Sequence, residues 1–413
     1  MPAGFRAALA GIAALAALAL AACGDPATGD RPPENSAKTL TIYSSLPLHG
    51  PDRDRSRDMV NAIKLAIAES RGRIGEFRIT YAPLDSSTAK EGNWTHDRVL
   101  ENARVAVRDQ NTIALIGDLH SAATALALPL VNEGHILQVT PTSTYDGLTR
   151  PGGSRKGEPE RFYPSGRRTL GRMVAPDHVQ GAALISWMKQ EGVKRLTILH
   201  DQALFAGGIV EQLEELAEGP SVEIVDKDRV DARDGDLSDE AREVASSAAD
   251  AFFFAGESDA GAARMFNAVA AADPDMLLFA PGAVAAGTFA TDLSPAAARR
   301  MHVTTATLPP RLLPASARAF RARFRTEFGT EPVPDALLAY EAAKVVMDAI
   351  RKAGKRGNDR VAVSKAFFTT RDRSSVLGRY SIDRFGDTSL QTYAGNRVRR
   401  SRLVLDKLLK VRG

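Results

Sequence analysis

The chain has 413 residues, of which 44% are hydrophobic and 25% are charged. This composition is ordinary for a soluble globular protein of two domains, and it excludes a chain that is disordered as a whole. The formal charge of +4 rests on 54 basic and 50 acidic residues that are mostly interspersed, so nucleic-acid binding has little support.

The N-terminal segment has the features of an export signal. Arg6 precedes an Ala/Leu-rich run that ends at Cys23, the single cysteine of the chain. This run is shorter than the about 20 apolar residues of a membrane span, and it predicts a signal peptide over residues 1–22. The letters LAAC, which end at Cys23, resemble the lipobox of bacterial lipoproteins, in which the cysteine carries the lipid; a lone buried cysteine is the alternative.

Residues 23–38 are polar and contain proline, as expected of a flexible tether behind a lipid anchor. We therefore expect the mature protein to be lipid-anchored at the outer, extracytoplasmic face of a cell membrane. With Cys23 used in this way, no thiol remains for a disulfide, a catalytic cysteine or a thiolate metal site.

From residue 39 onward, short β-rich runs alternate with amphipathic segments, which indicates parallel βαβ units. In the first helical segment, Met59, Ile63 and Ile67 recur every four residues and share one helix face. The first series predicts strands at 39–46, 77–87, 113–118 and 136–141, and helices at 56–70, 96–109 and 121–134.

A second series begins near Asp177. It predicts helices at 179–192, 207–219, 238–250 and 259–273, and strands at 195–201, 221–230, 251–256 and 276–282. A crossover strand is expected at 301–307, followed by three helical stretches between 315 and 370 and two closing strands near 378–383 and 391–398.

Two such series predict an α/β protein with two doubly wound parallel-sheet lobes, joined by crossing strands, with a ligand cleft between the lobes. We expect the first lobe to comprise residues 39–168 and 304–377, and the second lobe residues 169–303 and 378–413. In such sheets, ligands bind beyond the carboxyl ends of the strands. The residues at these ends are rich in hydroxyl groups and poor in catalytic pairs: Ser45, Asp85, Ser86, Asp118 to Ser121, Thr140 to Thr144, Asp201 to Phe205, Glu257 and Gly282.

Motifs of enzymes and metal sites are missing from the sequence. The seven histidines show no HExxH or other close pairing, and there is no GxSxG elbow, phosphate-binding loop or dinucleotide-binding turn. His120 and Ser121 are adjacent, whereas a nucleophile and its base usually come from separate elements. We therefore predict no catalytic residue, no metal and no cofactor, and expect that the protein is not an enzyme.

Ser121 follows one predicted strand and opens the next helix. Two interpretations remain open: a plain helix N-cap, or part of a carboxylate site formed by a hydroxyl beside a helix N-terminus. Thr142 and Thr144 follow the neighbouring predicted strand. If the sheet is wound as predicted, three hydroxyl groups converge on this helix terminus.

The segment "LIGDLHSAATALALPLVNEGHILQVTPTSTYDGLT" resembles type I periplasmic binding proteins, in particular the leucine/isoleucine/valine-binding group of ABC importers. The shared features are a glycine, a serine that opens a helix, an "sP.at"-like turn and a final "lT". Further similar segments follow in the same order, and together they cover nearly the whole mature chain: "APDHVQGAALISWM", "RLTILHDQALFAGG" and "YSIDRFGD".

This resemblance implies that Ser121 and Thr144 hold the α-carboxylate of the ligand, with a backbone carbonyl from Thr142. Phe205 stands where the family has an aromatic residue of the second lobe that covers the ligand. Glu257 falls near another ligand contact of that lobe.

The chain departs from the pattern at Gly282, where the amino-acid binders have the acid that receives the ligand's ammonium group. Simpler interpretations also remain for the other positions. Phe205 is equally consistent with a core aromatic, Glu257 with an acid in the first turn of a helix, and Thr142 with a residue that only shapes its turn.

The resemblance implies an extracytoplasmic solute-binding lipoprotein of an ABC importer, which closes its lobes over a small polar, carboxylate-bearing ligand such as an amino acid. Its partners would be the ligand, the ABC permease and ATPase subunits, and the membrane through the lipid anchor, with no nucleic acid. Two alternatives stay open: a ligand sensor or cell-wall regulator on the same fold, and a hydrolase.

Overall fold

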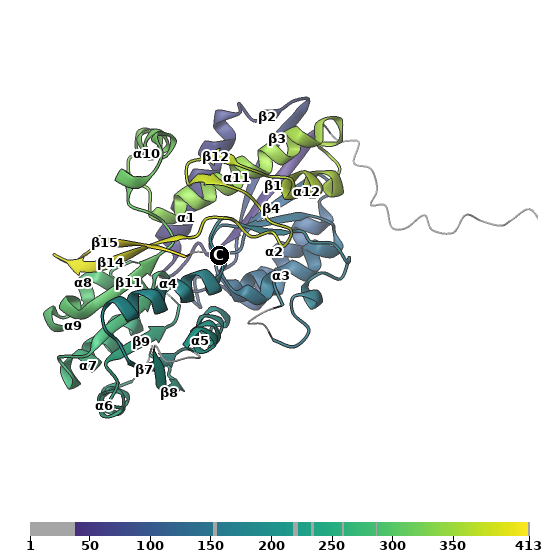
Figure 1. Cartoon of the computed structure of the whole chain (residues 1–413). Coiled ribbons are helices and arrows are strands. Elements are labelled where there is room, and N and C mark those ends of the chain that lie inside the picture. The colour runs from purple at the N-terminus through teal and green to yellow at the C-terminus, as the bar shows by residue number, and fades with distance from the viewer. Residues whose placement is uncertain are drawn as a thin grey trace, which may run out of the picture. The chain divides into compact units, whose positions relative to one another are not determined.

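The computed structural model describes residues 38–151, 155–217, 222–232, 235–257, 260–285 and 287–411. The predicted signal peptide, the tether up to residue 37 and Cys23 lie outside the described residues. The described chain forms two large sheets, each with helices on both faces (Figure 1), so the predicted α/β fold with two parallel-sheet lobes is confirmed.

The first sheet has the strand order β2-β3-β1-β4-β5-β6. Its strands are parallel except that β2 pairs antiparallel with β3. Their bounds are β1 (Thr39–Leu46), β2 (Arg73–Ile74), β3 (Phe77–Asp85), β4 (Thr112–Gly117), β5 (Leu137–Thr140) and β6 (Leu170–Arg172). Residues of β4 and β5 are buried throughout, as expected of central parallel strands covered on both faces.

Two sets of helices cover this sheet. One face packs against α1 (Arg53–Glu69), α10 (Ala315–Phe328), α11 (Pro334–Ala353) and α12 (Arg360–Phe368), whose apolar side chains form one core. The other face packs against α2 (His96–Arg108) and α3 (Ser121–Glu133). The chain between residues 315 and 368 therefore belongs to the lobe of the N-terminal strands, although about 130 residues of the other lobe precede it.

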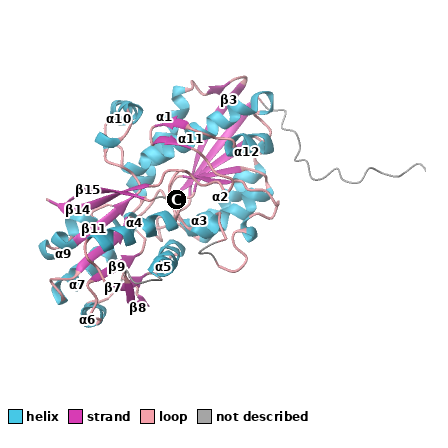
Figure 2. Cartoon of the chain, in the orientation of Figure 1, coloured by secondary structure: helices cyan, strands magenta, loops and turns pink. Residues whose placement is uncertain are grey.

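The second sheet has the order β15-β14-β11-β10-β9-β7-β8. Strands β7 (Arg195–His200), β8 (Glu223–Arg229), β9 (Ala251–Ala255), β10 (Leu277–Pro281) and β11 (Met301–Thr305) are parallel, and β14 (Thr392–Arg399) and β15 (Arg402–Lys410) extend the sheet as an antiparallel hairpin (Figure 2). One face carries α4 (Asp177–Gln190) and α5 (Leu204–Ala217). The other carries α6 (Ser238–Ser246), α7 (Ala260–Ala272), α8 (Phe289–Asp292) and α9 (Pro295–Arg300).

The chain passes three times between the two sheets. The first passage follows β6, which still pairs with β5, so it comes a few residues after the predicted limit at residue 169. The second follows β11. The third precedes β14, because the small hairpin of β12 (Arg373–Ser375) and β13 (Gly378–Tyr380) packs with Ile382 on the core of the first lobe, beyond the predicted limit at residue 378.

Candidate ligand-binding site

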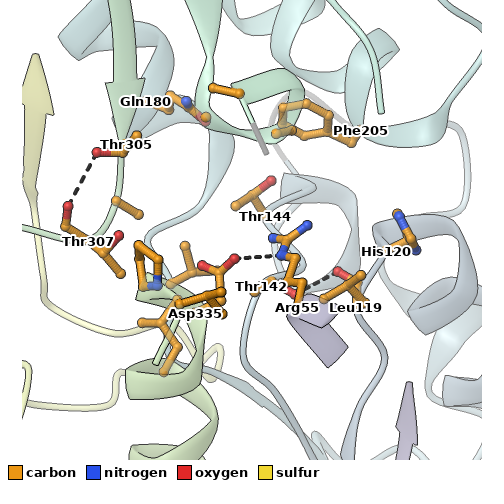
Figure 3. A pocket seen from close by; sticks show the side chains of 18 of the residues that line it. Arg55, Leu119, His120, Thr142, Thr144, Gln180, Phe205, Thr305, Thr307 and Asp335 are labelled. Carbon is orange, nitrogen blue, oxygen red and sulfur yellow. Dashed lines mark hydrogen bonds and ion pairs between the residues drawn. The ribbon is translucent and has the colours of Figure 1, made fainter. Parts of the chain in front are cut away.

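A cavity of about 440 Å³ lies at the carboxyl ends of the strands of both lobes (Figure 3). Every residue predicted for ligand binding lines it. The first lobe contributes Ser121, Thr142 and Thr144, and the second lobe contributes Phe205 and Glu257. Gly282 of the second lobe also lines the cavity. The structure thus brings together six positions that are spread over about 160 residues of sequence.

Ser121 is the first residue of α3, and His120 before it has the extended backbone of an N-cap residue. Of the two interpretations left open for Ser121, the plain N-cap therefore does not fit the structure. Its hydroxyl oxygen instead accepts a hydrogen bond from the backbone N–H of Tyr145, at 3.3 Å. The first backbone hydrogen bond of the helix is donated by Thr124, so the N–H groups of the turn before it are free of α-helical bonds.

The loop after β5 carries the two threonines. The Thr142 hydroxyl donates to the backbone carbonyl of Leu119 at 2.6 Å, and this bond uses its only hydrogen. Thr144 is buried, and its carbonyl accepts a hydrogen bond from the Asp177 N–H at 2.9 Å. The loop is thereby fixed against both α3 and the start of α4.

The second lobe contributes Phe205 from the first turn of α5, Glu257 two residues after β9, and Gly282 directly after β10. Phe205 is only 8% exposed and also packs in the core of its lobe. A Cβ atom at Gly282 would lie 2.8 Å from the carbonyl oxygen of Thr304. Even the smallest side chain at this position would require the backbone to shift, so the cavity wall here is bare backbone.

A charged pair that sequence reasoning missed faces the same cavity. The Arg55 Nε donates to Asp335 Oδ2 at 2.5 Å (Figure 3). The Arg55 Nη1 also lies 3.4 Å from Asp52 Oδ1. Arg55 belongs to the first turn of α1 and Asp335 to that of α11. Both look like ordinary charges at helix N-termini in the sequence, and 280 residues separate them, so no local signal links them.

His120 joins the two lobes electrostatically. Its Nε2 lies 3.2 Å from Asp52 Oδ2 in the first lobe and 3.7 Å from Glu257 Oε2 in the second. Burial alone would lower the pKa of His120, but these two carboxylates outweigh burial and the nearby Arg55, so the pKa is raised. The pKa of Glu257 is also raised, mainly by burial, with His120 and a hydrogen bond from Trp94 acting in the opposite direction.

We expect His120 to make the stability of the unliganded protein depend on pH. Because its pKa in the folded protein is raised above the ordinary 6.5, its stabilising contribution is complete below pH 6.5 and is lost as the pH rises through the raised value. His120→Gln should remove this loss. The measurement is the thermal midpoint of both proteins between pH 5.5 and pH 8.5.

The variant Glu257→Gln serves as the matched control, because it removes the partner across the cleft and should reduce the same pH dependence. An unchanged slope in His120→Gln would show that His120 does not carry a proton in this site.

The described residues contain no group of three or more His, Cys, Asp or Glu side chains placed to hold a metal ion. In the same part of the chain, no helix is both long and apolar enough to cross a membrane. The cavity offers hydroxyl groups, backbone N–H groups, one guanidinium and the two carboxylates of Glu257 and Asp335 around an apolar wall. This is the composition of a site that recognises a small molecule with a polar end.

The sequence from residue 39 to residue 394 matches the family model of periplasmic binding proteins. The chain belongs to this family. The match covers the first lobe, all three passages and the second lobe up to the start of β14. The sequence matches none of the curated proteins with which it was compared.

Solved structures of similar fold come from several bacteria. A leucine-binding protein of Thermotoga maritima is 21% identical, with a TM-score of 0.74 over 90% of this chain and 99% of the other. A solute-binding protein of an ABC transporter from R. palustris, in complex with benzoate, is 17% identical, with a TM-score of 0.74 over 90% and 96%. A substrate-binding protein from Desulfitobacterium hafniense, in complex with leucine, is 18% identical, with a TM-score of 0.70 over 89% and 99%.

At these identities the likeness establishes the type I periplasmic binding fold. The last two of these proteins are binding proteins of ABC transporters, and the ligands named for the three proteins are leucine and benzoate. Family and neighbours alike are binding proteins rather than enzymes.

Proposed function

We propose that this protein is the extracytoplasmic solute-binding lipoprotein of an ABC importer, and that it closes its two lobes over a small carboxylate-bearing molecule, an amino acid or a related acid. The observation that carries the proposal is the convergence of Ser121, Thr142 and Thr144 with Phe205 and Glu257 on one cavity. Differential contacts with the closed form would make that form the one recognised by a permease.

The carboxylate end of the ligand is assigned to the first turn of α3. N–H groups at a helix N-terminus and a positive dipole end favour an anion, and the Ser121 and Thr144 hydroxyls border this terminus. Thr142 acts through its backbone carbonyl, because its hydroxyl hydrogen is already bonded to Leu119. Phe205 covers the ligand from the second lobe.

The other end of the ligand cannot be held as the family's amino-acid binders hold it, because Gly282 offers no carboxylate. A buried ammonium group without a partner is costly. Either Glu257 receives it, in competition with His120 at 3.7 Å, or the ligand lacks an amino group.

A thermal-shift panel tests the function and separates these two cases. It compares leucine, isoleucine and valine with their des-amino acids, amides and aromatic acids. A specific ligand at 100 times its Kd should add about 2.7 kcal/mol of stability. If amides shift the midpoint as much as acids do, or no acid shifts it at all, the carboxylate assignment is wrong. Tight leucine binding that Glu257→Gln leaves unchanged would overturn the inference from Gly282.

The lipid anchor has its own test. We expect Cys23→Ser to release the protein from the membrane fraction without changing its fold, because the cysteine acts only through its lipid. The measurement is fractionation of cells that express either form, after cleavage of the signal peptide has been verified by mass. A Cys23→Ser protein that stays with the membrane would contradict the lipoprotein assignment.

A further inference from the structure

A second cavity of about 440 Å³ lies at the passages between the lobes, where it is lined by residues of all three. Met173 to Ala175 come from the first passage, Ala306 to Leu308 from the second, and Leu390 to Tyr393 from the third. We call it the hinge cavity. The remaining walls come from residues 312–314, α11 and the turn of the β12–β13 hairpin.

The walls of the hinge cavity are mainly apolar. Seven leucines line it: Leu308, Leu312, Leu313, Leu337, Leu338, Leu377 and Leu390. Leu312 is 42% exposed and is one of the few large apolar side chains that face solvent among the described residues. The only charged side chain on the wall is Arg379, which is exposed. Of the other six leucines, Leu308, Leu377 and Leu390 are partly buried and Leu313, Leu337 and Leu338 are buried. A concave surface lined by leucines, one of them exposed, suits an apolar group of a ligand.

The hinge cavity and the ligand cavity are adjacent. Five residues line both: Val174, Ala306, Thr307, Leu338 and Tyr393. The polar groups that recognise a carboxylate belong to the ligand cavity alone, whereas the leucines of the hinge cavity offer no hydrogen-bond partner. Both cavities have mainly apolar linings and share these five residues as a border. The carboxylate-binding groups lie on one side of it, and six leucines that line the hinge cavity alone lie on the other.

We propose that the hinge cavity receives the apolar tail of the ligand, so that the protein binds an amphiphilic acid whose carboxylate lies at Ser121 and whose hydrocarbon part extends past Val174 and Tyr393 into the hinge. This inference rests on the proposed function. It names the substrate class more narrowly: monocarboxylates with an extended apolar chain, longer than the side chain of leucine.

The physical basis is the burial of methylene groups. Each buried CH₂ contributes about 0.8 kcal/mol, which corresponds to about a fourfold gain in affinity. The affinity should rise with every carbon that enters the hinge cavity, and should stop rising when the cavity is filled. A tail in the hinge also contacts the segments that move during closure, so it would stabilise the closed form directly.

The test measures the Kd of the full mature chain for straight-chain monocarboxylates from butanoate to decanoate by titration calorimetry. We expect one molecule per chain and about a fourfold gain per added carbon in the longer acids. Leu312→Trp narrows the hinge cavity without touching the ligand cavity, and should abolish the gain for the longer acids while leaving butanoate unchanged.

Leu216→Trp is the matched control, because Leu216 is an exposed leucine of α5 that lines neither cavity. It should leave the whole series unchanged. Ser121→Ala should weaken every acid of the series by a similar factor, since all would share one position for the carboxylate.

The outcomes separate the inference from the proposed function. If short acids bind but affinity does not rise with chain length, the tail assignment is wrong and the binding function stands. The same holds if affinity rises with chain length equally in Leu312→Trp. If two molecules of decanoate bind per chain, the hinge cavity is a separate binding site, and the tail assignment is also wrong. If no acid of the thermal-shift panel or of this series binds, the proposed function itself falls.

Discussion

Replacing Asp387 with Asn should lower the free energy of unfolding by about 3–5 kcal/mol, the usual cost of removing one partner from a buried ion pair. Asp387 is 2% exposed, and its Oδ1 lies 2.9 Å from Nε of Arg172, which is fully buried. Arg150 Nε lies 2.5 Å from Oδ2, and the Thr149 hydroxyl donates to Oδ1 at 2.9 Å. Without the carboxylate, the Arg172 charge would remain buried and uncompensated.

The same network supports the ligand cavity. The guanidinium of Arg172 donates to the backbone carbonyls of Ser143 and Tyr145, each at 3.2 Å. These carbonyls flank Thr144 in the loop that lines the cavity, and Asp387 lies close to the third passage between the lobes. Asp387→Asn should therefore weaken ligand binding in addition to stability.

The contribution of Asp387 to the free energy of unfolding should be lost at acidic pH. Burial alone would raise its pKa, but Arg172, Arg150 and Thr149 outweigh burial and hold the pKa below the ordinary 3.8. A lowered pKa means that the stabilisation is complete above pH 3.8 and is lost as the pH falls through the lower folded value. Urea unfolding between pH 3 and pH 7 should show this acid loss in the wild type and less of it in Asp387→Asn.

Glu160→Gln provides the control for this experiment. Glu160 forms an ion pair with Arg168 at 3.3 Å, but its side chain is 72% exposed, and such exposed pairs contribute about 0–1 kcal/mol. If Asp387→Asn costs no more than Glu160→Gln, the buried network does not stabilise the lobe as described.

The sequence predicted the central strands and the long helices well, because their patterns are strong. β1 has the predicted limits, and α3 begins at the predicted residue and ends one residue early. β6 escaped prediction because three residues carry no periodicity. β15 escaped prediction because its apolar residues stand in a run (Leu403–Leu405) and a pair (Leu408 and Leu409), so the sequence lacks the apolar–polar alternation typical of a half-buried strand.

In the candidate site, too, some residues could be predicted from the sequence and others could not. Ser121, Thr142 and Thr144 follow strand ends of one sheet, so topology alone brings them together. Arg55 and Asp335 could not be predicted, because their pairing depends on the contact between α1 and α11 across 280 residues. The hinge cavity is formed by three separate passages of the chain, so no local sequence pattern predicts it.

The assignment of Ser121 as a ligand contact makes a prediction that a helix cap would not share. We expect Ser121→Ala to weaken binding of the acid that gives the largest thermal shift by about 1–3 kcal/mol, the cost of removing one hydrogen bond to a charged group in a buried site. The unliganded protein should lose much less stability. The only hydrogen bond formed by this hydroxyl within the described residues is the long one from Tyr145.

Ser294 is the matched control, because it is a true N-cap: its hydroxyl accepts from the backbone N–H of Ala297 at the start of α9, at 3.2 Å, and Ser294 does not line the ligand cavity. Ser294→Ala should lower the free energy of unfolding by about 1 kcal/mol and leave the Kd unchanged. Titration calorimetry gives the Kd of each variant, and urea unfolding gives the free energy of unfolding of each. Equal losses of binding and stability in Ser121→Ala would mean that Ser121 only supports the fold, and that the anion is held by other groups at the start of α3.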